Sequence, residues 1–232
     1  MSKGKSFFKE ILIIILMIIL FLIPSIVEAI ARMNVFGFEN VKGTNYLNVS
    51  LTGIDAIVPM IVSILFVFIF IYLSKKLNIQ KIDLSFINKK NIVYIIIGFI
   101  VMRIIVYSGI SILNFQGIDQ TANDKLIIDV YKNTSWYLVI VTSVIFAPIV
   151  EEILFRGYII GHIFKKKPIL GIIISSLIFG SIHTATNITS LVMYSLMGAV
   201  FGIVYYKTKR LEVSMSVHIL NNIVAIVPML FI

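Results

Sequence analysis

The chain has no cysteine, few acidic residues and no long polar stretch. The lack of cysteine excludes disulfides, a thiol nucleophile and zinc sites built from cysteine. Of the 232 residues, 59% are hydrophobic, and the mean hydropathy is +1.03, well above the level of soluble domains. Because no polar stretch is long enough for a separate soluble domain, we expect residues 1–232 to form a single membrane domain. Its fold class should be all-α, a polytopic bundle of transmembrane helices.

Seven stretches are apolar over the length of about 20 residues that a transmembrane helix needs. They run roughly over Ile11–Ile30, Ile54–Leu73, Ile92–Leu113, Trp136–Phe164, Ile169–Thr186, Ile188–Tyr206 and Val213–Ile232. Almost nothing separates the fifth stretch from the sixth, so these two predict a tight helical hairpin. Pro148 falls inside the fourth span, where a proline kinks the helix and frees a carbonyl for another partner.

Basic residues are distributed unevenly between the predicted loops. With a cytoplasmic N-terminus, fourteen lie on the inner side: Lys3, Lys5, Lys9, Lys75, Lys76, Lys81, Lys89, Lys90, Lys165, Lys166, Lys167, Lys207, Lys209 and Arg210. Only four lie outside: Arg32, Lys42, Lys125 and Lys132. This bias follows the positive-inside rule and supports seven spans with the N-terminus in the cytoplasm. It also accounts for the formal net charge of +9 without nucleic acid as a partner.

The first span shares features with a signal peptide, namely a basic start, an apolar stretch and the small-residue pattern Ala29-Ile30-Ala31. Its apolar stretch is long for that role, so we expect an uncleaved span. Cleavage would leave the other six spans and their orientation unchanged.

The fourth span concentrates charge at membrane depth, where charged side chains are costly and usually functional. Glu152 and Arg156 are four residues apart and can pair on one helix face. Glu151 lies about 100° around the helix axis and has no opposite charge on its own face. The spacing therefore predicts one paired carboxylate and one that is available as a base. Arg103, in the third span, is expected to pair with a buried acid, either Glu152 or Asp55.

Two further spans contribute imidazoles. His183 lies in the fifth span, and His218 lies in the seventh, four residues before Asn222 on the same face. The remaining histidine, His162, is close to a lysine cluster and is expected at the inner membrane boundary. At about 1.5 Å per residue, Glu151 and His183 should lie about 21 to 23 Å from that boundary, but His218 only about 12 Å. The three side chains would meet only if helices tilt or if the last span begins deeper than this count assumes.

These residues form three motifs in order: Glu151-Glu152-Ile-Leu-Phe-Arg156, Phe179-Gly-Ser-Ile-His183 and His218-Ile-Leu-Asn-Asn222. They resemble the EExxxR, FxxxH and HxxxN motifs of the CPBP family, the CAAX proteases and bacteriocin-processing enzymes, also called the Abi family. The resemblance covers roughly residues 136–222.

The resemblance implies an intramembrane endopeptidase whose peptidase core lies at about 136–222. Carried over, Glu151 and His183 would activate water, His218 and Asn222 would form an oxyanion hole, and Glu152 and Arg156 would support them. A base together with donors aimed at developing negative charge is also what amide hydrolysis requires. The implied substrate is a membrane-associated peptide or protein, and the expected location is a bacterial plasma membrane.

We expect the site to need no cofactor, although zinc bound by Glu151, His183 and His218 is the alternative. Other intramembrane peptidase classes fit poorly, since the chain has no HExxH, no Gly-x-Ser-Gly and no GxGD. Two functions of other kinds stay open. One is an ion-coupled transporter, since intramembrane Glu, Arg and His also relay protons. The other is a non-catalytic regulator or immunity protein of the same family.

Overall fold

A computed structural model describes residues 3–80, 82–132 and 134–228, and these residues form helices without a strand. The helices are α1 (Lys3–Phe36), α2 (Ile54–Lys76), α3 (Lys89–Phe115), α4 (Ala122–Tyr131), α5 (Trp136–Val139), α6 (Ala147–Glu151), α7 (Pro168–Ile182), α8 (Ile188–Thr208) and α9 (Leu211–Ile226). The π-helical segment Ile140–Phe146 joins α5 to α6, and a second one, Glu152–Ile163, continues α6, so that Trp136–Ile163 forms one long span. Short 3-10 turns cover Phe38–Asn40, Asn45–Asn48 and Leu84–Phe86.

The described part of the chain has five helices that are long and apolar enough to cross a membrane, and α7 and α9 are shorter apolar helices. The all-α polytopic fold is therefore confirmed, with seven apolar helical segments where the sequence predicts spans. α7 and α8 form the predicted hairpin. α9 ends at Ile226, and residues 229–232 of the seventh expected span lie outside the described residues.

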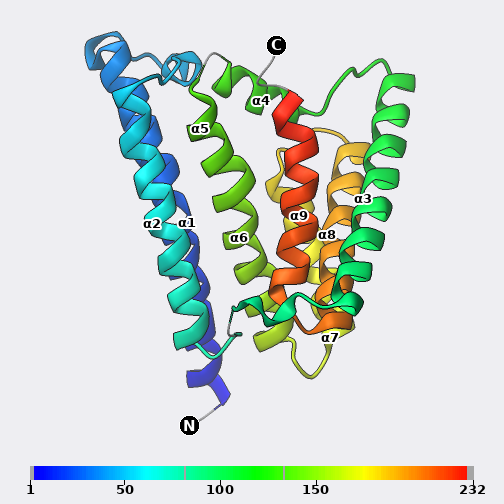
Figure 1. Cartoon of the computed structure of the whole chain (residues 1–232). Coiled ribbons are helices and arrows are strands. Elements are labelled where there is room, and N and C mark those ends of the chain that lie inside the picture. Colours follow the sequence, from blue (N-terminus) through cyan, green and yellow to red (C-terminus); the bar gives the residue numbers. More distant parts are fainter. Residues whose placement is uncertain (1–2, 81, 133, 229–232) are drawn as a thin grey trace.

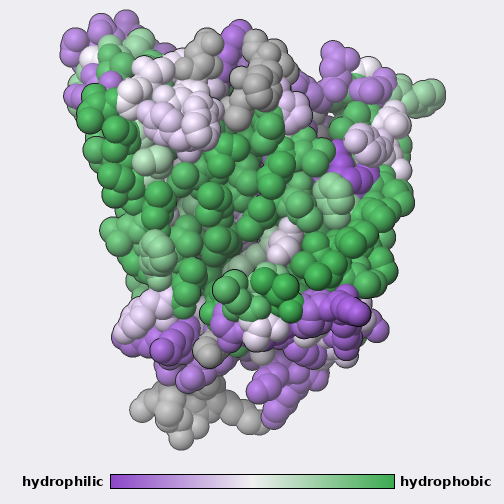
Figure 2. All heavy atoms as spheres, viewed as in Figure 1, coloured by the Kyte–Doolittle hydropathy of each residue, from purple (hydrophilic) through white to green (hydrophobic). Residues whose placement is uncertain are grey.

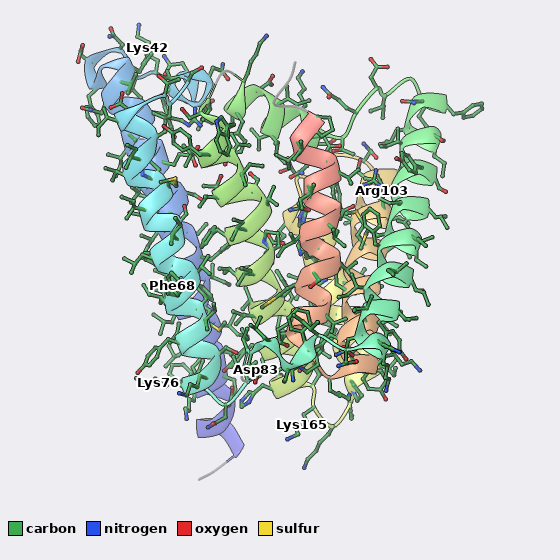
Figure 3. The ribbon with its side chains drawn as sticks, viewed as in Figure 1. Lys42, Phe68, Lys76, Asp83, Arg103 and Lys165 are labelled. Atoms are coloured by element: carbon green, nitrogen blue, oxygen red, sulfur yellow. The ribbon has the colours of Figure 1, made fainter. Side chains whose placement is uncertain are left out.

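On the face shown in Figure 2, an apolar band separates two polar ends of the bundle. Lys76, Asp83 and Lys165 lie at the end where α1 begins, and Lys42 lies at the opposite end (Figure 3). α1 and α2 pack side by side, the fourth span crosses the middle, and α3, α8 and α9 form the other side (Figure 1). The basic residues that the sequence assigns to the inner side, Lys76 and Lys165, thus lie at one end of the bundle, and Lys42, assigned to the outer side, lies at the other.

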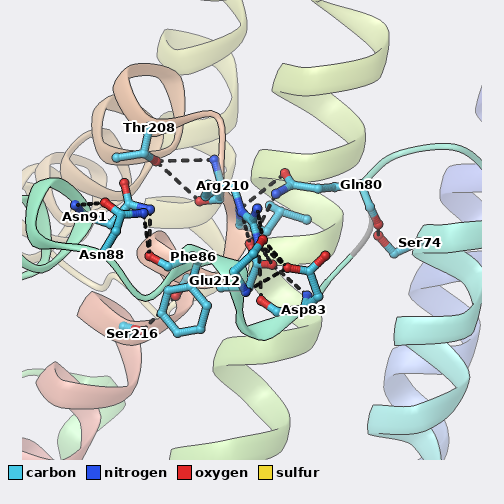
Figure 4. A network of polar contacts seen from close by, with 12 residues as sticks. Ser74, Gln80, Asp83, Phe86, Asn88, Asn91, Thr208, Arg210, Glu212 and Ser216 are labelled. Atoms are coloured by element: carbon cyan, nitrogen blue, oxygen red, sulfur yellow. Dashed lines mark hydrogen bonds and ion pairs between the residues drawn. The ribbon is translucent and has the colours of Figure 1, made fainter.

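α9 begins deeper than the sequence count assumes. Leu211 is fully buried, and Glu212 and Ser214 are also buried. Glu212 accepts hydrogen bonds from Gln80 and from the backbone N–H of Asp83, within a polar network at the inner end (Figure 4). The first turn of α9 is therefore already inside the bundle. As a result, His218 lies at the level of Glu151 and Glu152 in the fourth span.

Candidate active site

Glu151 ends α6 and faces the interior of the bundle. Its residue exposure is 8%, and it lines an internal cavity. Its Oε2 atom is buried and has no hydrogen-bond partner among the described residues. His218 Nε2 lies 3.8 Å from that oxygen. The prediction that this carboxylate lacks a basic partner on its own helix holds, and a histidine from another helix faces it instead.

Glu152 and Arg156 form the ion pair that their spacing predicts. Their Oε1 and Nη1 atoms are 3.1 Å apart, and both side chains are 0% exposed. Arg156 also donates through Nη2 to the carbonyl of Gly198 at 2.9 Å. Its guanidinium lies 4.7 Å from the ring centre of Phe179 and 5.0 Å from that of Phe201. Aromatic faces and a backbone carbonyl thus surround the buried cation.

Glu152 has a second role that helical spacing does not predict, because it holds His218. The Nδ1–H of His218 donates to Glu152 Oε1 at 3.0 Å, and the Ser214 hydroxyl donates to Oε2 of the same carboxylate. The imidazole ring stacks on Phe201 with centroids 4.3 Å apart. Because a carboxylate holds Nδ1–H, the ring turns Nε2 toward Glu151.

The sequence predicts His183 within the fifth helical span, but in the structure it lies just after the helix. It caps α7, which ends at Ile182, and it precedes Thr184, whose φ is +47°. Its Nδ1 lies 2.7 Å from the carbonyl of Phe179. A carbonyl can only accept, so Nδ1 carries the proton and Nε2 of the neutral ring is left as an acceptor. Apolar periodicity does not show where α7 ends, so the sequence extended this helix too far.

Tyr194 of α8 is a residue that sequence reasoning missed. Its ring stacks on His183 with centroids 4.9 Å apart. Its hydroxyl lies 2.9 Å from Thr121 Oγ1 and donates to Asp124 Oδ1 at 3.3 Å. The start of α4 therefore fixes the tyrosine, and the tyrosine supports the histidine ring. No motif spacing could reveal how Tyr194 is held, because its hydrogen bond to Asp124 joins residues 70 positions apart.

Asn222 lies one turn after His218 on α9, as predicted. Its side-chain amide donates to the carbonyl of Ser143 at 2.8 Å. Its Oδ1 accepts from the amide of Asn221 at 3.3 Å. An asparagine amide has two N–H donors, so one remains for a ligand in the cavity.

The prediction that Arg103 pairs with Glu152 or Asp55 is wrong. Its guanidinium donates to Asn221 Oδ1 at 3.1 Å and lies 4.7 Å from the ring centre of Tyr107. The prediction failed because Glu152 is already held by Arg156 and His218, and because depth in a span does not tell which neighbouring helix a side chain faces. His162, in contrast, is partly exposed and pairs with Glu10 at 3.2 Å, near the start of α1 as expected.

Glu151, His183, His218 and Asn222 line one cavity of about 400 Å³. Its walls also include parts of α1, α2, α3, α4, α8 and the fourth span. The other polar lining residues include Ser25, Glu28, Ser63, Arg103, Asn123, Asp124, Thr142, Ser143, Tyr194 and Asn221. Glu152 and Arg156 lie behind this wall rather than in it. The structure therefore brings the four predicted catalytic residues to one space and places the two supporting residues next to them.

The alternative zinc site would need Glu151, His183 and His218 to converge on one point. Within the described ranges, no three His, Asp or Glu side chains are arranged so that they could hold a metal ion. His218 has its Nδ1 committed to Glu152, and His183 has its Nδ1 committed to a carbonyl, so each ring has only Nε2 left for a ligand.

Residues 133–224 match the family model described as type II CAAX prenyl endopeptidase Rce1-like. The match includes all three motifs and the four cavity-lining candidates. The predicted resemblance to the CPBP family is confirmed for this segment. The apolar helices make the chain a multi-pass membrane protein.

Curated bacterial proteins are similar to this chain, and two of the three described here are named as membrane peptidases or proteases. It is 34% identical over 112 residues to YdiL of Bacillus subtilis, named as a candidate membrane peptidase, and covers 44% of that protein and 48% of itself. It is 30% identical to YaiH of Lactococcus lactis over 67% of this chain and 64% of the relative. It is 27% identical to the membrane-embedded CAAX protease MroQ of Staphylococcus aureus over 90% of this chain and 84% of the relative.

The chain thus spans less than two thirds of the first two relatives. No solved structure matches it.

Proposed function

We propose that the protein is an intramembrane endopeptidase that hydrolyses peptide bonds with a glutamate-activated water and without a metal. The observation that carries the proposal is the meeting of two oriented imidazoles, an amide donor and a buried carboxylate whose Oε2 has no hydrogen-bond partner among the described residues, all in one cavity. The family match and the names of the relatives agree with this reaction class.

In the proposed first step, Glu151 accepts a proton from water as the water oxygen bonds to the substrate carbonyl carbon. His183 Nε2, left as an acceptor by the bond at Nδ1, can hold the same water. The carbonyl oxygen becomes an oxyanion. His218 Nε2–H and the remaining N–H of Asn222 would donate to it.

In the second step, the tetrahedral intermediate collapses and the C–N bond breaks. Glu151 returns its proton to the leaving amine, so the enzyme is restored and one water is consumed. Glu152 supports both steps by accepting the Nδ1–H of His218, so that the second proton that the oxyanion contact requires would sit on Nε2, which faces Glu151. This is the orienting role that a buried carboxylate has in other acid–base sites.

The proposed substrate is a membrane-associated peptide or protein in a bacterial plasma membrane. The apolar helices and their many exposed large apolar side chains, which form the apolar band in Figure 2, support a lipid environment for this substrate. Leader peptides, peptide pheromones and bacteriocins belong to this substrate class. Prenylated C-terminal tails, which the family description names, are the other source of such a peptide.

The test compares the membrane peptides of cells that carry the wild type, Glu151→Gln or the matched control Glu39→Gln. Glu39 lies in an exposed turn outside the cavity. We expect at least one peptide to be released by the wild type and the control but not by Glu151→Gln. Purified protein should cut that peptide at an unchanged rate in the presence of a chelator. An identical peptide pattern in all three strains would overturn the proposed hydrolysis, and loss of cutting with the chelator would overturn the metal-free mechanism.

A further inference from the structure

Arg103 is a cation at membrane depth that the proposed chemistry does not use. It lies near the middle of α3 on the cavity wall (Figure 3). Its Nε atom is buried and has no hydrogen-bond partner in the described part of the chain. Its Nη1 atom donates a hydrogen bond to Asn221 Oδ1 at 3.1 Å. A charge in this place is expensive and is usually retained for function.

Arg103 begins a chain of three hydrogen bonds that all run in the same direction. The guanidinium donates to Asn221 Oδ1, the Asn221 amide donates to Asn222 Oδ1 at 3.3 Å, and the Asn222 amide donates to the Ser143 carbonyl at 2.8 Å. Arginine can only donate and a carbonyl can only accept. The two ends therefore force the orientation of both amides between them.

Pro148 explains why the Ser143 carbonyl, at the end of this chain of hydrogen bonds, can accept from a side chain. In the π-helical segment Ile140–Phe146, the N–H of Ala147 bonds to the carbonyl of Thr142, five residues back. The next bond of this register would run from residue 148 to the Ser143 carbonyl, but proline has no N–H. Asn222 supplies the missing donor.

We propose that Arg103, Asn221 and Pro148 are positioning residues that orient and polarise the Asn222 amide, and this role rests on the proposed function. Hydrogen bonds in a chain strengthen one another in a low-dielectric interior. The amide is therefore fixed before substrate arrives, with its second N–H directed into the cavity. A fixed donor is what oxyanion stabilisation needs.

The kinetic test uses the peptide that the wild type releases and Glu151→Gln does not, made with a fluorophore and a quencher on either side of the cut bond. In reconstituted full-length protein, Arg103→Met should lower kcat about tenfold with KM unchanged, since removal of a direct oxyanion donor lowers kcat by about 10²- to 10³-fold. Arg103→Lys keeps a cationic donor and should recover most of the rate. Ser111→Ala, an exposed position on the same helix, is the control.

Two further variants separate positioning from stability. In an Asn222→Ala background, Arg103→Met should cause no additional loss of kcat, because the amide that it orients is gone. Pro148→Ala restores an N–H that competes for the Ser143 carbonyl. It should keep or raise the melting temperature and still lower kcat, which is the opposite of what a purely structural proline would do.

A spectroscopic measurement tests the hydrogen-bond chain without any substrate. The side-chain amide resonance of Asn222, assigned by its loss in Asn222→Asp, should shift in Arg103→Met and in Pro148→Ala but not in Ser111→Ala. An unmoved resonance, or kcat losses that multiply in the Asn222→Ala background, would overturn the positioning role. Failure of the hydrolase proposal is seen separately, as full cleavage by Glu151→Gln.

Discussion

Two buried Glu–Arg pairs with the same i,i+4 spacing lie in different regions of the molecule. Glu28 and Arg32, 2.6 Å apart on α1, join that helix to a backbone carbonyl of the segment before α2. Glu152 and Arg156, in the fourth span, share their carboxylate with His218 from α9. The spacing therefore identifies an ion pair. Whether the pair fixes a helix in place or orients a group in the candidate site depends on what it contacts outside its own helix.

The largest effect should come from the acid that belongs to neither pair. Glu151→Ala should lower cleavage at least about 10³-fold, and His183→Ala should also abolish it, because general-base catalysis contributes about 10²- to 10⁴-fold. Initial rates in proteoliposomes measure the loss, and protease protection checks that the variants are still inserted. Cleavage by Glu151→Ala at the wild-type rate would show that the base is assigned wrongly.

Asn222→Ala should have a smaller effect and leave measurable activity. Loss of one oxyanion donor lowers kcat by about 10²- to 10³-fold, while His218 continues to donate. The measurement is kcat and KM for the same peptide, and the expected change is in kcat. A change confined to KM would instead place Asn222 in substrate binding.

Arg32→Met and Arg156→Met test the comparison directly. Each leaves a buried carboxylate without its cation, so each should destabilise the protein by about 3 to 5 kcal/mol. Thermal unfolding in detergent measures this loss. Only Arg156→Met should lower kcat per folded molecule, since only its carboxylate also holds His218. Equal kcat losses in the two variants would mean that the two pairs do not differ in function.

The smallest effect concerns the polar network at the inner end (Figure 4). Hydrogen bonds from Ser85 and Arg210 hold the pKa of Asp83 well below its ordinary value. A lowered folded-state pKa means that the stabilisation is present above the unfolded pKa of about 3.9 and is lost as the pH falls below it. We expect Asp83→Asn to flatten the acid side of a plot of melting temperature against pH and to leave kcat unchanged. If the melting temperature of Asp83→Asn falls with acid as it does in the wild type, Asp83 does not contribute to the pH dependence of stability.

The sequence predicts most of what lies within one helix. The apolar stretches, the Glu152–Arg156 pair and the shared face of His218 and Asn222 all follow from helical periodicity. Motif order predicts the family, and the structure places the motif residues around one cavity.

Contacts between helices were harder to predict, because they depend on rotation and depth. Arg103 meets Asn221 instead of an acid, and Tyr194 reaches His183. The deep start of α9 also escaped the residue count, since charged Arg210 and Glu212 suggest a boundary at the membrane surface. Their mutual contacts and those with Asp83 let this polar turn lie against the bundle.

The left-handed turn at Lys209, with φ of +56°, sets the register of the last helix. It ends α8 and lets α9 begin two residues later, so His218 stands two turns beyond a fixed origin. One residue inserted in this connection would rotate the imidazole by about 100° and shift it by about 1.5 Å. Relatives that use the same histidine should therefore tolerate changes of length in their other loops but keep this connection constant.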